Sequence, residues 1–285
     1  MAALSSFAKG AARSGAEGRR LPYIDIGTDF RPLSLPRQQA LALRDAIVAC
    51  HEREGTGSAY RRQRLMDCGN PVSGGAETWV YKCNLPECPL CYRRRAYRKA
   101  AEAARMDAVL KESGLVSQML TISMPDTEAD GMAARYAELA ADCARLYRSK
   151  TYLRRIAGTA RCIETSIADT GLFHVHVHLL LLFRCGVLPA EIVPLVMRCF
   201  PSGEVYASEL WRFVCTARFA AYALKLPEGV TAKEWLTIRQ MMQGKRPLTF
   251  SGVLRRARRD GGKRRPPKRK CHEQETYEKT GQNCP

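Results

Sequence analysis

The segment from Phe173 to Phe183 constrains the fold of this chain most strongly. It reads Phe-His-Val-His-Val-His-Leu-Leu-Leu-Leu-Phe, so three of the five histidines in the chain alternate with apolar residues before an unbroken apolar run. Alternation has the period of a β-strand, so the three imidazoles project from one face while Val175 and Val177 lie on the other, buried face. A helix would spread the histidines around most of its circumference. The pattern therefore predicts a strand with a polar site at one end.

A histidine array of this kind favours a metal or phosphate site. Two interpretations without a ligand stay open: a polar ladder on the strand, and a set of solvated surface imidazoles. Neighbouring positions on one face lie roughly 6.7 Å apart, and His174 and His178 about 13 Å apart, so one ion is expected to use two adjacent histidines rather than all three. Neutral imidazole suits Zn, Mn, Fe or Cu. The remaining ligands must come from elsewhere in the chain.

The preceding segment, Arg161 to Ile167, also has the pattern of a strand. Asp169-Thr170-Gly171 is a turn signal between the two apolar runs. If these three residues form the loop of a hairpin, Glu164 lies opposite His176 on the histidine face, whereas a two-residue loop would place it on the other face. From spacing alone, Glu164 is equally well interpreted as a metal ligand and as a solvated strand carboxylate.

Composition and charge restrict the class of protein. The chain has 285 residues and a formal net charge of +18. No apolar run approaches the roughly 20 residues of a membrane span, and Met1 to Arg20 lacks the apolar core of a signal peptide, which favours a cytoplasmic protein without a membrane partner. The excess of basic residues indicates a polyanionic partner, with nucleic acid first, although a merely soluble basic protein would have the same composition.

Cysteines form a second cluster with a recognisable spacing. Without an export signal, the 12 cysteines of the chain indicate reduced thiols or metal binding rather than disulfides. Cys88 and Cys91 have the two-residue gap of a zinc knuckle, and Cys83 and Cys68 complete a tetrahedral structural Zn²⁺ site, with Cys68 the least certain ligand. A two-residue gap also occurs in redox proteins. Three arginines that follow the knuckle are candidates for phosphate contact or form a solvated basic turn: Arg93, Arg94 and Arg95.

The remaining pattern predicts an α+β fold, a central antiparallel sheet with helices on one face. Gln118 to Met124 is a further strand, and Thr231 with Glu234 forms a capping box that begins a helix closed by Gly244. Helices are expected over Pro36–His51, Ala96–Ser113, Gly131–Arg155, Leu188–Phe200 (begun near Pro189) and Ser208–Leu226. In the last of these, Ser208 is the N-cap, and Tyr222 and Lys225 share a face because they are three residues apart.

Four regions are expected along the chain. Residues 1–60 are an N-terminal appendage whose first 20 residues are disordered, and residues 61–95 are the cysteine-rich zinc module. Residues 96–254 form the main domain and residues 255–285 a basic disordered tail. Its arginines are interpreted as phosphate contacts or as solubilising charges: Arg255, Arg256, Arg258 and Arg259.

Four segments together resemble one family. Leu120 to Pro125, Phe173 to Leu181, Ala221 to Lys225 and Cys83 to Arg95 are similar to successive motifs of the rolling-circle replication initiators of bacterial plasmids, the single-tyrosine type of HUH (His-hydrophobic-His) endonucleases. The resemblance covers roughly residues 65–255 and implies a central antiparallel sheet with flanking helices. It also implies that the protein nicks one DNA strand at a plasmid origin. The expected substrate is single-stranded or hairpin DNA, and a host helicase and polymerase are the expected protein partners.

The resemblance assigns roles to particular residues. Tyr222 corresponds to the nucleophile that forms a 5′-phosphotyrosine and frees a 3′-OH, and Lys225 is expected to favour the phenolate or to hold the phosphate. His176 and His178 correspond to the HUH pair, and with Glu164 they are expected to hold a divalent ion, Mn²⁺ or Mg²⁺, that polarises the phosphate. His174 is a further candidate ligand.

The chain departs from the family pattern at Arg218, where a glutamate four residues before the tyrosine usually activates water for termination. Glu204 or Glu209 is a candidate replacement. Three alternatives stay open: an HUH transposase, a histidine-triad nucleotide hydrolase, and a non-catalytic DNA-binding regulator built on the zinc module. The transposase lacks its usual second tyrosine here, the hydrolase explains neither the knuckle nor the charge, and the regulator leaves the histidines unexplained.

Overall fold

The computed structural model describes residues 23–24, 37–74, 77–184, 187, 192–211, 214, 216–225, 227 and 229–263. The expected disorder of Ala2–Arg20, the expected helix start near Pro189 and the tail beyond residue 263 lie outside these residues. The strands are β1 (Tyr23–Ile24), β2 (Pro71–Gly74), β3 (Glu77–Val80), β4 (Val116–Ser123), β5 (Ile156–Ile167), β6 (Phe173–Phe183), β7 (Glu204–Trp211) and β8 (Leu248–Phe250). The helices are α1 (Arg37–Arg53), α2 (Ala59–Asp67), α3 (Pro89–Leu110), α4 (Met132–Arg148), α5 (Lys150–Arg155), α6 (Val193–Cys199), α7 (Thr216–Ala223), α8 (Ala232–Met241) and α9 (Gly252–Lys263).

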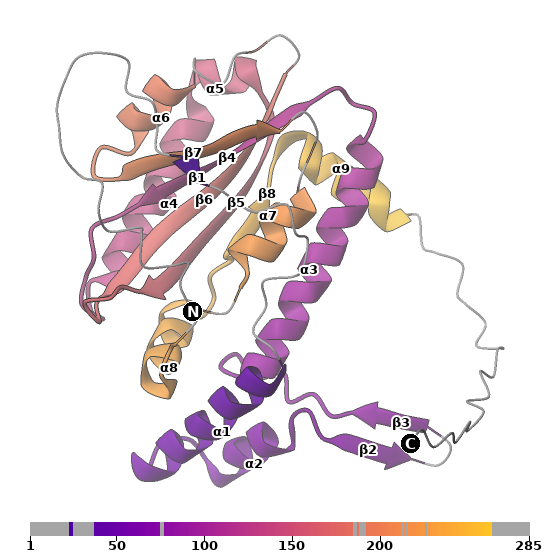
Figure 1. Cartoon of the computed structure of the whole chain (residues 1–285), viewed down its shortest axis with the longest axis vertical. Helices are drawn as coiled ribbons and strands as arrows, with labels where there is room; N and C mark the ends of the chain where they lie inside the picture. Colours follow the sequence, from indigo (N-terminus) through magenta and orange to yellow (C-terminus); the bar gives the residue numbers. More distant parts are fainter. Residues whose placement is uncertain are drawn as a thin grey trace, which may run out of the picture.

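The predicted α+β class and central sheet are confirmed. Six strands form one sheet in the order β1-β7-β4-β6-β5-β8, in which all pairs are antiparallel except the short β1, which runs parallel to β7 (Figure 1). The histidine strand β6 has the predicted bounds and lies between β4 and β5. A central strand of this kind is buried on both faces, which explains the unbroken apolar run after His178.

Helices cover both faces of the sheet, which corrects the expectation of helices on one face (Figure 1). On one face, Val175, Val177, Leu179 and Leu181 pack with apolar side chains of α4 and α6 in the main core. On the other face, Leu180 and Leu182 pack with α7 and α9. The helix α3 lies outside α7 and packs on it through small side chains. The apolar residues after the histidines are therefore divided between two cores according to strand parity.

The expected helix over Ser208–Leu226 is wrong. Residues 204–211 form strand β7, and the helix α7 begins only at Thr216. In the strand, Val205 and Ala207 pack in the main core, while Ser208 faces the other way and its hydroxyl accepts a hydrogen bond from the backbone N–H of Met119 at 3.1 Å. Ser208 is thus a buried strand residue rather than a helix N-cap.

Two other helices differ from expectation. The single helix predicted over Gly131–Arg155 is broken at Ser149, which has extended backbone angles (φ −64°, ψ 132°) between α4 and α5. The basic segment from Arg255 is not disordered as far as residue 263, because it belongs to the helix α9, whose apolar face buries Leu254 and Ala257. Its arginines are therefore displayed from a fixed helix face.

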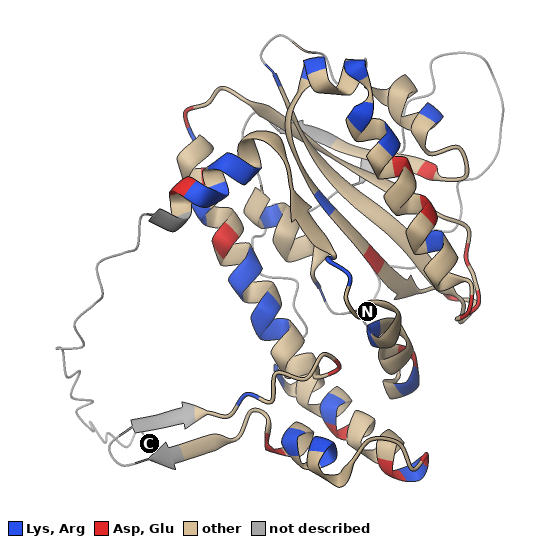
Figure 2. Ribbon diagram, turned by 180° about the vertical axis from the view of Figure 1, so that it is seen from behind, with Lys and Arg blue, Asp and Glu red and all other residues tan. Residues whose placement is uncertain are grey.

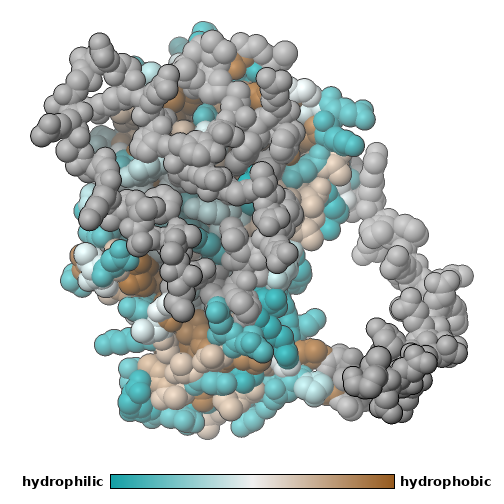
Figure 3. All heavy atoms as spheres, viewed as in Figure 1, coloured by the Kyte–Doolittle hydropathy of each residue, from teal (hydrophilic) through white to brown (hydrophobic). Residues whose placement is uncertain are grey.

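The cysteine region forms a distinct cluster at one end of the molecule. The predicted N-terminal helix is present as α1, and with α2 and the first turn of α3 it surrounds the four cysteines, while the hairpin β2–β3 projects to the side (Figure 1). Trp235 of α8 completes the same apolar cluster. Figure 3 shows hydrophilic and hydrophobic residues interspersed over this end. Tyr60 and Met66 of α2 are exposed.

Candidate metal and nucleophile site

The hairpin of β5 and β6 has the predicted register. Ala168 N–H donates to Leu172 O at 2.8 Å, so the loop consists of Asp169, Thr170 and Gly171, as expected, and Gly171 adopts a left-handed φ of 79° that suits glycine. Glu164 therefore lies directly opposite His176. The two residues share the sheet face that points toward α7.

Three side chains converge on this face. Glu164 Oε1 lies 2.7 Å from His176 Nε2 and 3.0 Å from His178 Nε2, and the three ligand atoms lie within 4.8 Å of one another. Burial acts to raise the pKa of Glu164, but the two histidines outweigh it and hold that pKa well below its usual range. Burial lowers the pKa of His176, which keeps the ring neutral and able to bind a metal.

The residues fit a divalent metal ion. Two imidazole nitrogens and a carboxylate oxygen lie within 4.8 Å of one another, and they form a common donor set for such ions. Thr121, across the sheet on β4, lies with its hydroxyl 2.8 Å from His178 Nδ1 and so fixes the ring from its other side. His178 is 1% exposed, and its position therefore depends on packing rather than on solvent.

His174 does not join this group. Its Nδ1 lies 2.6 Å from Asp126 Oδ1, and the structure places it outside the three-residue cluster. This agrees with the expectation that one ion draws on two adjacent histidines. His174 is instead held at the rim, half-buried, by a carboxylate of the loop after β4.

Tyr222 lies over the histidines. Its ring centroid is 5.1 Å from that of His178 at an interplanar angle of 73°, and Lys225 Nζ lies 5.0 Å from the centre of the tyrosine ring. Burial, followed by the negative charge of Glu164, raises the pKa of Tyr222 to about 12. The phenol is therefore protonated at neutral pH. Of the two roles expected for Lys225, holding a phosphate agrees better with this direction than favouring the phenolate.

Two contacts that the sequence analysis missed hold α7 in place. Asp107 of α3 accepts hydrogen bonds from the backbone N–H groups of Thr216 and Ala217 at 2.9 and 2.8 Å, so it caps the first turn of α7. At the other end, Cys162 Sγ donates to Ala223 O at 3.2 Å. Cys162 pairs with His178 across the sheet, so the strand that supports the histidine also positions the residue after the tyrosine.

The position of the missing glutamate and its two candidate replacements lie on different elements. Arg218 lies on α7 one turn before Tyr222. Glu204 of β7 shares the sheet face of the histidines, because both Glu204 and His176 pair with Ser123, and its carboxylate accepts a hydrogen bond from the Tyr206 hydroxyl at 2.5 Å. The side chain of Glu209 lies outside the described part of the chain.

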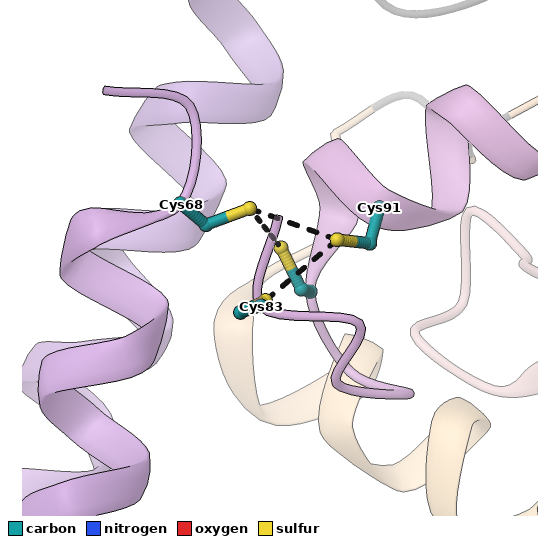
Figure 4. A group of neighbouring side chains, drawn as sticks. Cys68, Cys83 and Cys91 are labelled. Atoms are coloured by element: carbon teal, nitrogen blue, oxygen red, sulfur yellow. Dashed lines mark hydrogen bonds between the residues drawn. The ribbon is translucent and has the colours of Figure 1, made fainter. Parts of the chain in front are cut away.

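The four cysteines form a second candidate metal site. Their sulfur atoms lie 3.6 to 3.7 Å apart in the Cys68–Cys91, Cys88–Cys68 and Cys83–Cys91 pairs (Figure 4). Four thiolates at about 2.3 Å from one zinc ion would be separated by about 3.8 Å, so this spacing fits a tetrahedral Zn²⁺ site. Contacts among the thiols lower the pKa of Cys68 to about 6 and raise that of Cys88, so a cation is needed for all four to ionise together.

The local backbone explains how the cysteines converge. Cys68 ends α2, and Cys91 lies in the first turn of α3 (Figure 4). The backbone N–H of Asn84 donates a hydrogen bond to the Cys91 sulfur at 3.3 Å. Asn84 adopts a left-handed φ of 56°, which turns the chain sharply after Cys83. Arg44 donates to Cys68 O at 2.7 Å and places a positive charge beside the cluster.

The basic residues divide into two groups. Arg94 and Arg95 donate to backbone carbonyls of the cysteine region at 3.4 and 3.3 Å, and Arg93 donates to the Tyr97 hydroxyl at 3.2 Å, so these three residues have structural partners. By contrast, four arginines on α9 are exposed to solvent, of which one pairs with Glu102: Arg255, Arg256, Arg258 and Arg259. Figure 2 shows Lys and Arg gathered along α3 and α9 on the same side of the molecule.

The fold and these sites define an α+β protein with two candidate metal centres and a tyrosine over one of them. A family model described as "Replication protein" matches residues 76–190, which include Cys83–Cys91, β4 and the histidine strand but not Tyr222. The match supports the predicted resemblance to rolling-circle initiators and a role in plasmid replication. No curated protein and no solved structure matches the chain. Among the described residues, no helix has the length and apolar character needed to cross a membrane.

Proposed function

We propose that this protein initiates rolling-circle replication of a plasmid by nicking one DNA strand at the origin. The observation that carries the proposal is the position of Tyr222 against His178, one of the three side chains that converge on a candidate metal point. A nucleophile and a phosphate-polarising group are needed within one site for strand transfer. Single-stranded or hairpin DNA is the proposed substrate, and the exposed arginines of α9 contact its phosphates.

In the proposed reaction, Tyr222 Oη attacks the scissile phosphorus while the bond to the 3′-oxygen breaks. The tyrosine becomes a 5′-phosphotyrosine, and its proton ends on the departing 3′-OH, which serves as the primer for a host polymerase after a host helicase opens the duplex. Lys225 holds a non-bridging oxygen of the phosphate. Glu164, His176 and His178 hold Mn²⁺ or Mg²⁺, which when bound withdraws charge from the phosphate. The four cysteines hold structural Zn²⁺.

The covalent intermediate conserves the energy of the phosphodiester bond for strand rejoining. Release requires either the 3′-OH or an activated water. Because Arg218 occupies the position of the usual glutamate, we assign water activation to Glu204, which faces the same side of the sheet as His176. The histidine-triad hydrolase receives less support, because the Nε2 atom of His176 is engaged by Glu164 rather than free to attack a phosphate.

Covalent capture tests the proposal. The purified protein is mixed with 3′-labelled single-stranded DNA from its own replicon, with Mn²⁺ or with a chelator, and separated on a denaturing gel. A labelled protein band that requires metal is expected for the wild type and is expected to disappear in Tyr222→Phe.

The matched control is Tyr206→Phe, which removes a hydroxyl from the same sheet face and is expected to keep the band. No band in the wild type under any metal, with DNA binding intact, would favour the non-catalytic regulator. A band of equal strength in Tyr222→Phe would assign the nucleophile to another residue.

A further inference from the structure

A pocket adjoins the candidate metal site on the side of α8. Its cavity volume is about 50 Å³, and it is partly open to solvent. Glu164 and Lys225 line it together with Tyr92, Trp235 and Arg239, between β5 and α8. A group bound in this pocket would therefore lie next to the phosphate that Tyr222 attacks.

Arg239 is held in a fixed orientation at the pocket. Its Nε donates to Pro86 O at 3.0 Å, and its guanidinium lies 5.1 and 5.6 Å from the ring centroids of Tyr92 and Trp235. Trp235 is in turn fixed by a hydrogen bond from Nε1 to Glu87 O at 2.6 Å. Within the described residues, neither terminal nitrogen of Arg239 has a hydrogen-bond partner. A planar pair of donors is thus preformed beside the pocket.

The edge of β5 supplies further polar groups. Ile163 N–H donates to Pro247 O at 3.2 Å, away from β6, and alternate residues of an antiparallel strand point the same way, so the backbone groups of Thr165 also face this side. The strand β8 pairs with β5 only as far as Cys162. The pocket therefore offers both a backbone donor and a backbone acceptor beyond the end of β8.

Apolar residues form most of the remaining walls, namely Ala223, Pro227, Ile238, Met242 and Pro247. Thr165 and Ser166 of β5 also line the pocket. Apolar walls with a few convergent polar groups suit a flat heteroaromatic ring better than a phosphate, and the carboxylate of Glu164 would repel a second phosphate. Arginine stacked on aromatic rings is a common partner of unpaired bases.

We propose that this pocket binds an unpaired guanine base of the DNA strand, next to the scissile phosphate. Arginine can only donate hydrogen bonds, and guanine offers two adjacent acceptors, O6 and N7, whereas adenine offers N7 beside an amino donor. The pocket thereby selects the base beside the nick. This inference rests on the proposed function, because it takes single-stranded DNA as the substrate.

Equilibrium binding measures the preference without any chemistry. Dye-labelled twelve-nucleotide oligonucleotides of dT that carry a single central dG, dA or dT are titrated with the full-length protein by fluorescence anisotropy, with no divalent ion added. The wild type is expected to bind the dG oligonucleotide at least about fivefold more tightly than the dA oligonucleotide.

Two variants of α8 separate base contact from charge. Arg239→Lys keeps the positive charge but loses the paired donors, so the dG preference is expected to vanish. Lys233→Gln removes a charge from the exposed side of the same helix, so the preference is expected to remain while all affinities fall slightly. Ser166→Leu, which narrows the pocket from β5, is expected to abolish the preference independently, should Arg239→Lys disturb folding.

Three outcomes would overturn the proposal. Equal binding of the three oligonucleotides by the wild type, or a dG preference that survives in both Arg239→Lys and Ser166→Leu, would exclude a guanine pocket. Equal weakening of all three by Arg239→Lys would assign Arg239 to a phosphate. A covalent adduct at Tyr222 without any base preference would support the proposed nicking function and exclude the guanine pocket. A base preference without an adduct would support the guanine pocket and exclude nicking by Tyr222.

Discussion

His178 joins more of the candidate site than any other side chain described above. It is buried, it contacts Glu164 through one ring nitrogen and Thr121 through the other, and its ring packs against Tyr222. We expect His178→Ala to lower nicking more than about a hundredfold, because a proposed metal ligand is lost, and to change DNA affinity little, because the side chain is not exposed to solvent.

Parallel measurements of adduct formation and of oligonucleotide binding check this expectation. His174→Ala is the matched control, since His174 lies on the same strand face but outside the three-residue group. Comparable losses of binding and nicking in His178→Ala would contradict a purely catalytic role for His178.

At the residue scale, local patterns were informative and distant contacts were not. The alternation of β6 and a three-residue turn at Asp169–Gly171 together predicted that Glu164 faces His176, because register within a hairpin follows from loop length; a two-residue loop would have placed Glu164 on the other face. By contrast, Thr121 is 57 residues from His178 and Asp107 is 109 residues from Thr216. Nothing in the sequence gives the contacts between elements that are so far apart along the chain.

At the element scale, the strand β7 shows why one helix was assigned wrongly. The apolar residues from Ser208 to Leu226 fit the period of a helix as well as that of a strand, and a serine at the start is also typical of a helix N-cap. The strand is specified by the neighbouring β4, which supplies the hydrogen bonds of the ladder. The capping box of α8 was predicted correctly, because Thr231 and Glu234 contact each other within one turn.

The cysteine cluster gives a prediction at the same scale. Cys88→Ser is expected to abolish bound zinc and to lower the melting temperature, because α1, α2 and the start of α3 pack around the four sulfurs. Zinc content by elemental analysis and thermal melting measure both effects. Cys199→Ser changes a buried cysteine of α6 far from the cluster and is expected to retain zinc. Full zinc content in Cys88→Ser would remove the proposed site.

At the scale of the whole molecule, charge governs the approach to DNA. The net charge of +18 and the exposed arginines of α9 predict that DNA affinity falls steeply with salt. We expect the combined replacement of Arg255, Arg256 and Arg259 by glutamine to reduce the slope of log affinity against log salt by about 2 to 3.

A second triple variant controls for net charge alone. It replaces Arg148, Lys150 and Arg154 by glutamine. These three residues are exposed on α4 and α5, across the sheet from α9. This variant is expected to keep the wild-type slope. Equal slopes in the two triple variants would show that α9 is not a preferred phosphate contact.

The helix α3 links the two candidate metal centres of the molecule. It has 22 residues and therefore spans about 33 Å, with Cys91 in its first turn and Asp107, which caps the helix of Tyr222, near its last. Tyr92, which follows Cys91 in this helix, lines the pocket that Glu164 also lines, so the two candidate centres lie beside one pocket. The two centres are therefore mechanically coupled: a change at the cysteine end of α3 reaches both the wall of that pocket and the cap of the helix that carries Tyr222.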